Sequence, residues 1–175
     1  MVISPNNSPD GDRISIRPAC SDDVRQLVRL AGELGYPTET DEMRLRLEKI
    51  TSRTDHAVFV AERRAPAPGR PGSSNGRGGE GILGWVHVAR EISLEAGETA
   101  EILGLVVDRG ARRAGVGRRL VTAAEEWGRA LALRRIVVRS AVTREEAHRF
   151  YPALGYLLAK TQRKYVKALG GSPDG

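Results

Sequence analysis

The chain has 175 residues, of which 40% are hydrophobic and 29% are charged, and this fits one globular domain with its own core. Its single cysteine, Cys20, excludes an intramolecular disulfide framework and favours a reducing compartment. The sequence shows neither a signal-peptide pattern nor an apolar run of membrane-spanning length, so we expect a cytoplasmic protein without a membrane partner.

The net charge of +6 is unevenly distributed along the chain. Residues 1–99 carry 13 Lys/Arg against 15 Asp/Glu, whereas residues 100–175 carry 15 against 7. A basic C-terminal half suits a polyanionic ligand, and a mildly acidic N-terminal half suits a cationic one. A general preference for arginine on solvated faces explains the total charge equally well.

Hydrophobic periodicity and turn residues predict the elements of the first half of the chain. Residues 1–12 are rich in Ser, Pro, Asn, Asp and Gly and are expected to be disordered. The expected elements are a strand at 13–17, helices at 24–34 and 40–51, and strands at 56–62 and 81–89 that pair as a hairpin. Prolines, glycines and serines between the two hairpin strands predict a flexible insertion at about 64–80.

The second half alternates strands and helices. We expect a buried strand at 101–107, a glycine-bearing turn, a helix with an apolar stripe from Val116 to Leu131, and a strand at 135–141. A helix with Glu145 and Glu146 in its first turn follows, then two final strands at 156–159 and 162–167 and a tail at 169–175.

The turn between strand 101–107 and the next helix has the composition of an anion site. Gly115 and Gly117 remove side chains where the first helical N–H groups have no intrahelical partner, so an anion can approach the backbone. Arg112, Arg113, Arg118 and Arg119 frame these glycines. A structural turn with solvated arginines is the simpler alternative, but four arginines within eight residues favour a phosphate cradle.

Two common phosphate-binding motifs do not fit this turn. Gly110 and Gly115 have P-loop spacing, but Val116 and Gly117 stand where a Lys-Ser/Thr pair would hold nucleotide phosphates and magnesium. In the dinucleotide fingerprint a third glycine is required where this chain has Leu120. ATP and NAD are therefore poor candidates.

The pattern Arg112-x-x-Gly115-x-Gly117 resembles motif A of the GCN5-related N-acetyltransferase (GNAT) superfamily. Downstream, the stretch from Ala147 to Tyr156 resembles the family's A-x-x-F-Y-x-x-x-G-F/Y motif. The resemblance covers roughly residues 13–168. It implies a single mixed α/β domain over those residues, with a central twisted sheet of about seven strands and about four flanking helices.

The same resemblance implies the cofactor, acetyl-CoA, and the residues that bind it. The pyrophosphate would lie on the turn, and the pantetheine arm and acetyl group on the backbone of the preceding strand. The implied cofactor-binding residues are Leu105, Val106, Val107, Arg112, Arg113, Ala114, Gly115, Val116, Gly117 and Arg118.

Acetyl transfer to an amine needs a base or a desolvated site, because an alkylammonium with a pKa near 10.4 is almost fully protonated at pH 7. Glu101 matches the position of a catalytic glutamate in several family members, and period-two alternation predicts that it lies on the same side as Leu105. Tyr151 matches the family's tyrosine near the CoA sulfur, a general acid. A solvent-facing glutamate and a core Phe-Tyr pair are the alternatives.

The acceptor wall in this family corresponds to the region of the first two helices. We hypothesise that Glu39, Asp41 and Glu42 recognise a cationic amine, although solvated helix-end charges are an equally good explanation. The chain departs from the family's downstream motif at two positions. Arg144 replaces a frequent Asn, which would either lose an amide contact or gain a phosphate contact. Pro152 removes a backbone donor after Tyr151 and would bend the helix and displace Tyr151.

The sequence thus predicts an acetyl-CoA-dependent N-acetyltransferase that uses a small-molecule or peptide primary amine in a ternary complex. A non-catalytic acyl-CoA-binding or regulatory module is the alternative. Nucleic-acid binding is suggested only by a pI near 10.0 and by no motif. We expect no metal, because the three histidines are scattered. A lone strand histidine such as His87 is more often a packing or surface residue than a catalytic one, and a position near the acceptor is the alternative. The acceptor's identity stays open, and a homodimer is common in the family.

Overall fold

The computed structural model describes residues 14–63 and 81–169, which form two compact units divided after Arg139. The predicted disordered segment, the predicted insertion and the last residues of the predicted tail lie outside these ranges. The first unit contains β1 (Ile14–Pro18), α1 (Val24–Leu34), α2 (Thr40–Thr51), β2 (His56–Arg63), β3 (Ile82–Ser93), β4 (Gly97–Val107), α3 (Val116–Ala130) and β5 (Ile136–Val138). The second unit contains α4 (Glu145–Phe150).

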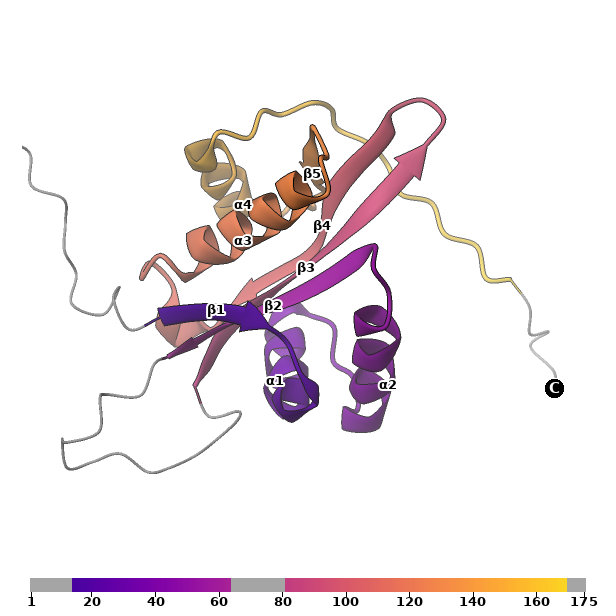
Figure 1. Ribbon diagram of the computed structural model, residues 1–175. Helices are drawn as coiled ribbons and strands as arrows, with labels where there is room; N and C mark the ends of the chain where they lie inside the picture. The colour runs from indigo at the N-terminus through magenta and orange to yellow at the C-terminus, as the bar shows by residue number, and fades with distance from the viewer. Residues whose placement is uncertain (1–13, 64–80, 170–175) are drawn as a thin grey trace, which may run out of the picture. The chain divides into compact units, whose positions relative to one another are not determined.

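The first unit is built on one mixed sheet with strand order β1-β2-β3-β4-β5. The first four strands pair antiparallel, and β5 is parallel to β4 because α3 carries the chain back between them. Figure 1 shows α1 and α2 on one face of this sheet and α3 on the other. The predicted mixed α/β fold class is confirmed.

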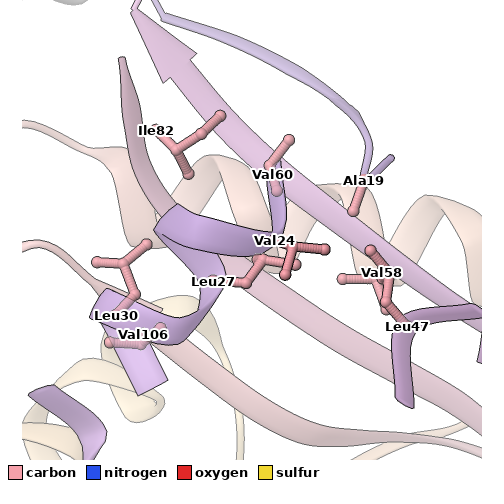
Figure 2. Close-up of a cluster of buried hydrophobic side chains, with 9 residues drawn as sticks. All are labelled: Ala19, Val24, Leu27, Leu30, Leu47, Val58, Val60, Ile82 and Val106. Atoms are coloured by element: carbon pink, nitrogen blue, oxygen red, sulfur yellow. The ribbon is translucent and has the colours of Figure 1, made fainter. Parts of the chain in front are cut away.

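A cluster of buried aliphatic side chains joins α1 and α2 to the sheet (Figure 2). Leu30 of α1 and Val60 of β2 are both 0% exposed, and Val106 of β4 belongs to the same cluster. On the opposite face Leu120 of α3 is also 0% exposed, and its Cδ1 lies against Gly84 of β3. Apolar residues on both faces of the central strands therefore bury the strand that leads into the predicted cofactor turn.

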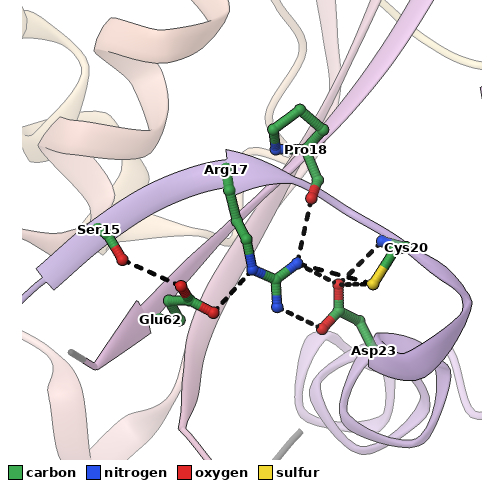
Figure 3. A network of polar contacts seen from close by, with 6 residues as sticks. All are labelled: Ser15, Arg17, Pro18, Cys20, Asp23 and Glu62. Atoms are coloured by element: carbon green, nitrogen blue, oxygen red, sulfur yellow. Dashed lines mark hydrogen bonds and ion pairs between the residues drawn. The ribbon is translucent and has the colours of Figure 1, made fainter. Parts of the chain in front are cut away.

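A buried ion pair fixes the entry to α1 (Figure 3). Asp23 is 0% exposed and accepts two hydrogen bonds of 2.7 Å from the Arg17 guanidinium and one of 2.9 Å from the Cys20 N–H. The Nε of Arg17 donates to Glu62 of β2 at 2.7 Å. Burial would raise the pKa of Asp23, but the Arg17 and Cys20 donors outweigh it and lower that pKa. The network ties β1, β2 and the start of α1 together.

The second unit lacks the two final strands that the sequence predicts at 156–159 and 162–167. Within residues 140–169 the chain has no strand after α4 and the short helical turn Pro152–Leu154. Leu157, Leu158, Tyr165 and Val166 are all more than 80% exposed. Their apolar pattern suits a strand, but a strand forms only against a hydrogen-bonded neighbour, and the described residues provide none there. The sheet has five strands rather than the predicted seven.

Candidate active site

The strands β4 and β5 separate part of the way along the sheet. β4 pairs with β3 along nearly its whole length, but it pairs with β5 only at Ala100–Ile102. From 103 to 107 no strand in the described ranges lies beside β4 on that side, so alternate N–H and C=O groups face an open edge. The predicted cofactor-binding residues Leu105, Val106 and Val107 lie in this open part.

A β-bulge in β4 corrects one prediction about Glu101. His87 pairs with Gly104 while the next residue of β3, Val88, pairs with Ile102, so Leu103 is an extra residue. An extra residue reverses the alternation of side chains beyond it. Glu101 and Leu105 therefore lie on opposite faces of the sheet, not on the same face as predicted.

The glycine at the bulge receives an indole ring. A Cβ on Gly104 would lie 2.8 Å from Cζ3 of Trp85, so only glycine admits the ring in this position. The Trp85 Nε1–H is buried and has no hydrogen-bond acceptor among the described residues. A buried donor without an acceptor is uncommon in folded proteins. The opposite edge of the same ring, at Cζ3 and Cη2, lies against Gly104, close to the point where β4 and β5 separate.

The turn after β4 presents its backbone and three arginines. Gly115 precedes α3 with φ +79°, and Arg113 also adopts a positive φ of 65°. The following N–H groups, at Val116, Gly117 and Arg118, belong to the first turn of α3 and have no intrahelical partner. Arg112, Arg113, Ala114, Gly115 and Arg118 are exposed. The structure thus brings all the turn residues of the predicted cradle together.

The fourth arginine of the motif has a different contact. Arg119 donates from Nη1 to the carbonyl oxygen of Ile14 at 3.2 Å, and so holds the first residue of β1 against α3. Arg112 donates from Nε to the carbonyl oxygen of Val107 at 3.5 Å. One guanidinium therefore ties α3 to the sheet, and the other closes the turn onto the end of β4.

An ionic clasp fixes the same turn to α1. Glu33 accepts from Arg29 at 3.0 Å through one oxygen and from the Arg109 N–H at 3.2 Å through the other. Asp108 accepts from Arg29 and, at 2.8 Å, from the Gly110 N–H. Burial would raise the pKa of Asp108, but these donors lower it. Local sequence signals do not connect Glu33 with the turn, because Arg109 is 76 residues away along the chain.

Glu101 has the environment of a perturbed carboxylate. It is 5% exposed, and its Oε1 accepts from Nη1 of Arg139, the residue that follows β5. Burial raises the pKa of Glu101, and the negative charge of Glu91 acts in the same direction, while Arg139 opposes them. The net effect is a pKa above the ordinary value of 4.5, which suits a proton acceptor.

Two of the histidines that are scattered in the sequence meet on the same face of the sheet. His56 of β2 and His87 of β3 share a hydrogen bond of 3.0 Å between Nδ1 and Nε2, and their ring centroids are 5.3 Å apart. Burial, with a smaller contribution from His56, lowers the pKa of His87 to about 4. The period-two alternation of side chains predicts which face of its strand each ring lies on. The contact between the rings depends on the register between β2 and β3, which the sequence does not reveal.

Tyr151 lies in the second unit, at the junction of α4 and the helical turn that begins at Pro152. Its ring is 5.1 Å from that of Phe150 and 5.4 Å from that of Tyr156. Burial raises its pKa to about 12, although Arg144 opposes the shift. The hydroxyl is therefore protonated at neutral pH and can donate a proton. Pro152 starts the helical turn, where its missing N–H is not needed.

The predicted acceptor acids lie at the start of α2. Glu39 is its N-terminal flanking residue, and Asp41 and Glu42 are in its first turn. Glu42 accepts from the Thr38 hydroxyl at 2.7 Å and from Arg46, and these contacts lower its pKa. Acids at a helix N-terminus stabilise the helix whether or not a ligand binds. Their role toward an amine stays a prediction.

Two features are absent from the described ranges, a metal-binding cluster and a membrane-spanning helix. Residues 14–63 and 81–169 contain no group of three or more His, Cys, Asp or Glu that could hold a metal ion. In the same ranges we find no helix with the length and apolarity needed to cross a membrane.

Comparison with known proteins agrees with this fold. Residues 24–156 match the model of the acetyltransferase (GNAT) family. A transcriptional regulator from Bacillus halodurans is 25% identical with a TM-score of 0.71, over 88% of this chain and 99% of that one. Glucosamine-6-phosphate N-acetyltransferase from Arabidopsis thaliana is 20% identical with a TM-score of 0.67, over 87% and 97%. An aminoglycoside N-acetyltransferase in complex with CoA is 16% identical with a TM-score of 0.72, over 95% and 100%. Among curated proteins, no sequence matches the chain.

Proposed function

The chain belongs to the acetyltransferase (GNAT) family, and from this premise we propose that it transfers the acetyl group of acetyl-CoA to a primary amine in a ternary complex. One observation carries the proposal: an open strand edge leads directly into a turn with glycines and exposed arginines at a helix N-terminus. These two features match the two halves of CoA, an amide-rich arm and a polyanionic head.

The turn would bind the pyrophosphate. The N–H groups of Val116, Gly117 and Arg118 supply uncharged donors, and the helix dipole adds to their effect. Arg112, Arg113 and Arg118 supply positive charge next to these donors. The clasp through Glu33 and Asp108 holds the turn in place before the cofactor binds, which reduces the ordering cost of binding.

The open part of β4 would bind the pantetheine arm. Backbone groups at Leu105, Val106 and Val107 can hydrogen-bond an extended amide chain as a neighbouring strand would. A backbone N–H directed at the thioester oxygen would also stabilise the oxyanion that forms when the amine attacks. The bond from nitrogen to the acetyl carbon then forms, and the carbon–sulfur bond breaks.

Proton transfer is assigned to two side chains. Glu101 accepts the amine proton, since its raised pKa makes it a better base than a solvated carboxylate. The family motif assigns protonation of the leaving thiolate to Tyr151, whose hydroxyl keeps its proton at neutral pH. The acids Glu39, Asp41 and Glu42 are proposed to attract a cationic acceptor.

Calorimetry with acetyl-CoA tests the cofactor half of this proposal, with ATP and NAD as controls. We expect micromolar binding of acetyl-CoA alone. Arg118→Gln should weaken binding by a factor of about 10 to 150, because a hydrogen bond to a charged group contributes roughly 1.5–3 kcal/mol. Arg129→Gln, on the same helix but engaged with Glu125, is the matched control and should bind normally. Gly117→Val should abolish binding while the circular dichroism spectrum stays native.

Release of free thiol from acetyl-CoA tests the acceptor half. The panel comprises glucosamine 6-phosphate, an aminoglycoside, spermidine and a lysine peptide. Glu101→Gln should lower kcat by a factor of about 100 or more and shift the pH profile, because a positioned base contributes roughly 10²–10⁴. An unchanged pH profile would remove Glu101 from the mechanism.

A non-catalytic acyl-CoA-binding module is the second candidate. The observation in its favour is the ion pair between Glu101 and Arg139, because an arginine on the carboxylate opposes proton uptake. Tight acetyl-CoA binding with no thiol release for any amine of the panel would support this candidate. Restoration of turnover by Arg139→Gln would instead show that the arginine restrains an active base.

A further inference from the structure

Polar side chains on three neighbouring strands lie on the sheet face that carries α1 and α2. In antiparallel pairs, directly opposite residues point to the same face. His56 pairs with Ala89, and Ala89 pairs with Glu101, so these three form one row. The next residue of β3 on that face is His87, which pairs with Gly104 at the bulge. Two imidazoles and the proposed base therefore share one part of the sheet.

The centre of this row contains only a methyl group. Ala89 is 0% exposed and separates His56 from Glu101 by two strand spacings, roughly 10 Å between Cα atoms. Gly104, which pairs with His87, has no side chain of its own, and the Trp85 ring lies against it. His87 and Glu91 each lie two residues along β3 from Ala89, the partner of Glu101, and His87 is the one opposite Gly104, at the point where β4 becomes open.

The two imidazoles are arranged as a proton path. With 3.0 Å between Nδ1 of His56 and Nε2 of His87, one N–H lies between the rings and each ring keeps one further nitrogen. The further nitrogen of His87 is Nδ1, and that of His56 is Nε2. When a proton binds to one of these two nitrogens, a different proton can leave from the other nitrogen, because both rings then change tautomer.

The charged groups around the pair define its two ends. Nε2 of His56 lies 3.9 Å from Asp55, whose carboxylate is 38% exposed and also binds Arg53. Toward β4 the charged groups are Glu101 and its partner Arg139, and Glu91 of β3 acts electrostatically on Glu101. Among the described residues, His56 is the group whose charge affects the pKa of His87. One end of the pair therefore lies near a solvated carboxylate, and the other belongs to a residue two positions along β3 from Ala89, the partner of the proposed base.

We propose that His87 and His56 form a relay that carries the proton of the amine from Glu101 to solvent at Asp55. The inference rests on the proposed function, in which Glu101 receives that proton. The protonated Glu101 passes it, through a water molecule, to Nδ1 of His87. The Nε2 proton of His87 moves to Nδ1 of His56, and the Nε2 proton of His56 leaves to water, so each ring ends neutral.

Burial explains why such a relay is needed and why this pair suits it. Glu101 is 5% exposed, so its proton has little direct access to bulk water after each turnover. The pKa of His87, about 4, keeps this imidazole neutral at physiological pH. A neutral imidazole can accept and donate in one step, whereas a permanently charged one cannot accept.

Nuclear magnetic resonance of the ¹⁵N-histidine-labelled full chain tests the geometry without any substrate. We expect a scalar coupling between His56 Nδ1 and His87 Nε2 across their shared hydrogen bond, and a change in the His56 spectrum in His87→Gln. Independent titration of the two rings, with no coupling between them, would overturn the relay.

Turnover tests the relay itself, using whichever amine of the panel reacts fastest. His87→Gln keeps a hydrogen bond to His56 but cannot exchange protons, so kcat should fall about tenfold or more while the acetyl-CoA Kd stays within about twofold. His56→Ala should behave likewise and regain turnover with added imidazole, an effect that a purely structural role would not give. His148→Gln, in the second unit, should match the wild type.

The outcomes separate the relay from the proposed function. An active wild type with unchanged kcat in His87→Gln and His56→Ala would refute the relay and leave the transferase intact. If acetyl-CoA does not bind, or no amine is acetylated, the proposed function falls and the relay falls with it.

Discussion

His87 should make the protein sensitive to mild acid, and the size of this effect follows from its burial. The folded chain lowers the pKa of His87 from 6.5 to about 4, so between these values only the unfolded chain binds the proton. Stability is therefore unaffected well above pH 6.5 and falls as the pH drops toward 4. Between about pH 8 and pH 5 the loss amounts to about 2 kcal/mol of unfolding free energy.

Urea denaturation of the wild type and of His87→Gln at about pH 8 and pH 5 measures this contribution. Other groups titrate in both proteins, so the difference between the two pH-dependent changes isolates His87. We expect the wild type to lose about 2 kcal/mol more than the variant over this range. His148→Gln, which removes an exposed histidine, should lose as much as the wild type. Equal losses in wild type and His87→Gln would refute the burial argument.

Two further predictions concern stability. Asp23→Asn removes the buried carboxylate that accepts two hydrogen bonds from the partly exposed Arg17 guanidinium, which keeps Glu62 as its other charged partner, and should cost about 1–3 kcal/mol in urea denaturation; an unchanged unfolding free energy would contradict this account. Gly84→Ala places a Cβ 2.5 Å from the carbonyl oxygen of Val106 and should destabilise by roughly 1–3 kcal/mol. Gly32→Ala, in α1 with nothing within 4 Å of the new Cβ, should instead stabilise by roughly 0.5–1 kcal/mol. A thermal melt that ranks these two variants the other way would be inconsistent with the packing described.

The features that the sequence predicts well are those set by neighbours in the chain. The predicted second helix, at 40–51, is Thr40–Thr51 in the structure. The turn around Gly115 is also predicted correctly as the start of a helix, because glycine spacing and an apolar stripe are local signals. The assignment of the same turn as a phosphate cradle stays a prediction.

The features that the sequence does not predict depend on register between strands. The extra residue Leu103 follows no local signal, so period-two alternation assigns Glu101 to the wrong face. The contact of His56 with His87 and that of Arg139 with Glu101 join residues 31 and 38 positions apart. The prediction of strands after Gly155 is wrong for a related reason, since an apolar pattern cannot supply a hydrogen-bonded neighbour.

Because of the bulge at Leu103, the number of residues in β4 is more tightly constrained than their identity. Deleting one residue there would restore regular alternation and exchange the two faces over 97–102, while the residues from Gly104 onward kept their positions. One inserted residue thus sets which face of the sheet carries Glu101 relative to the side chains of the open part of β4, where we propose that the cofactor binds. Among natural variants of this strand, we expect side chains to change freely and insertions or deletions between Glu101 and Leu105 to be rare.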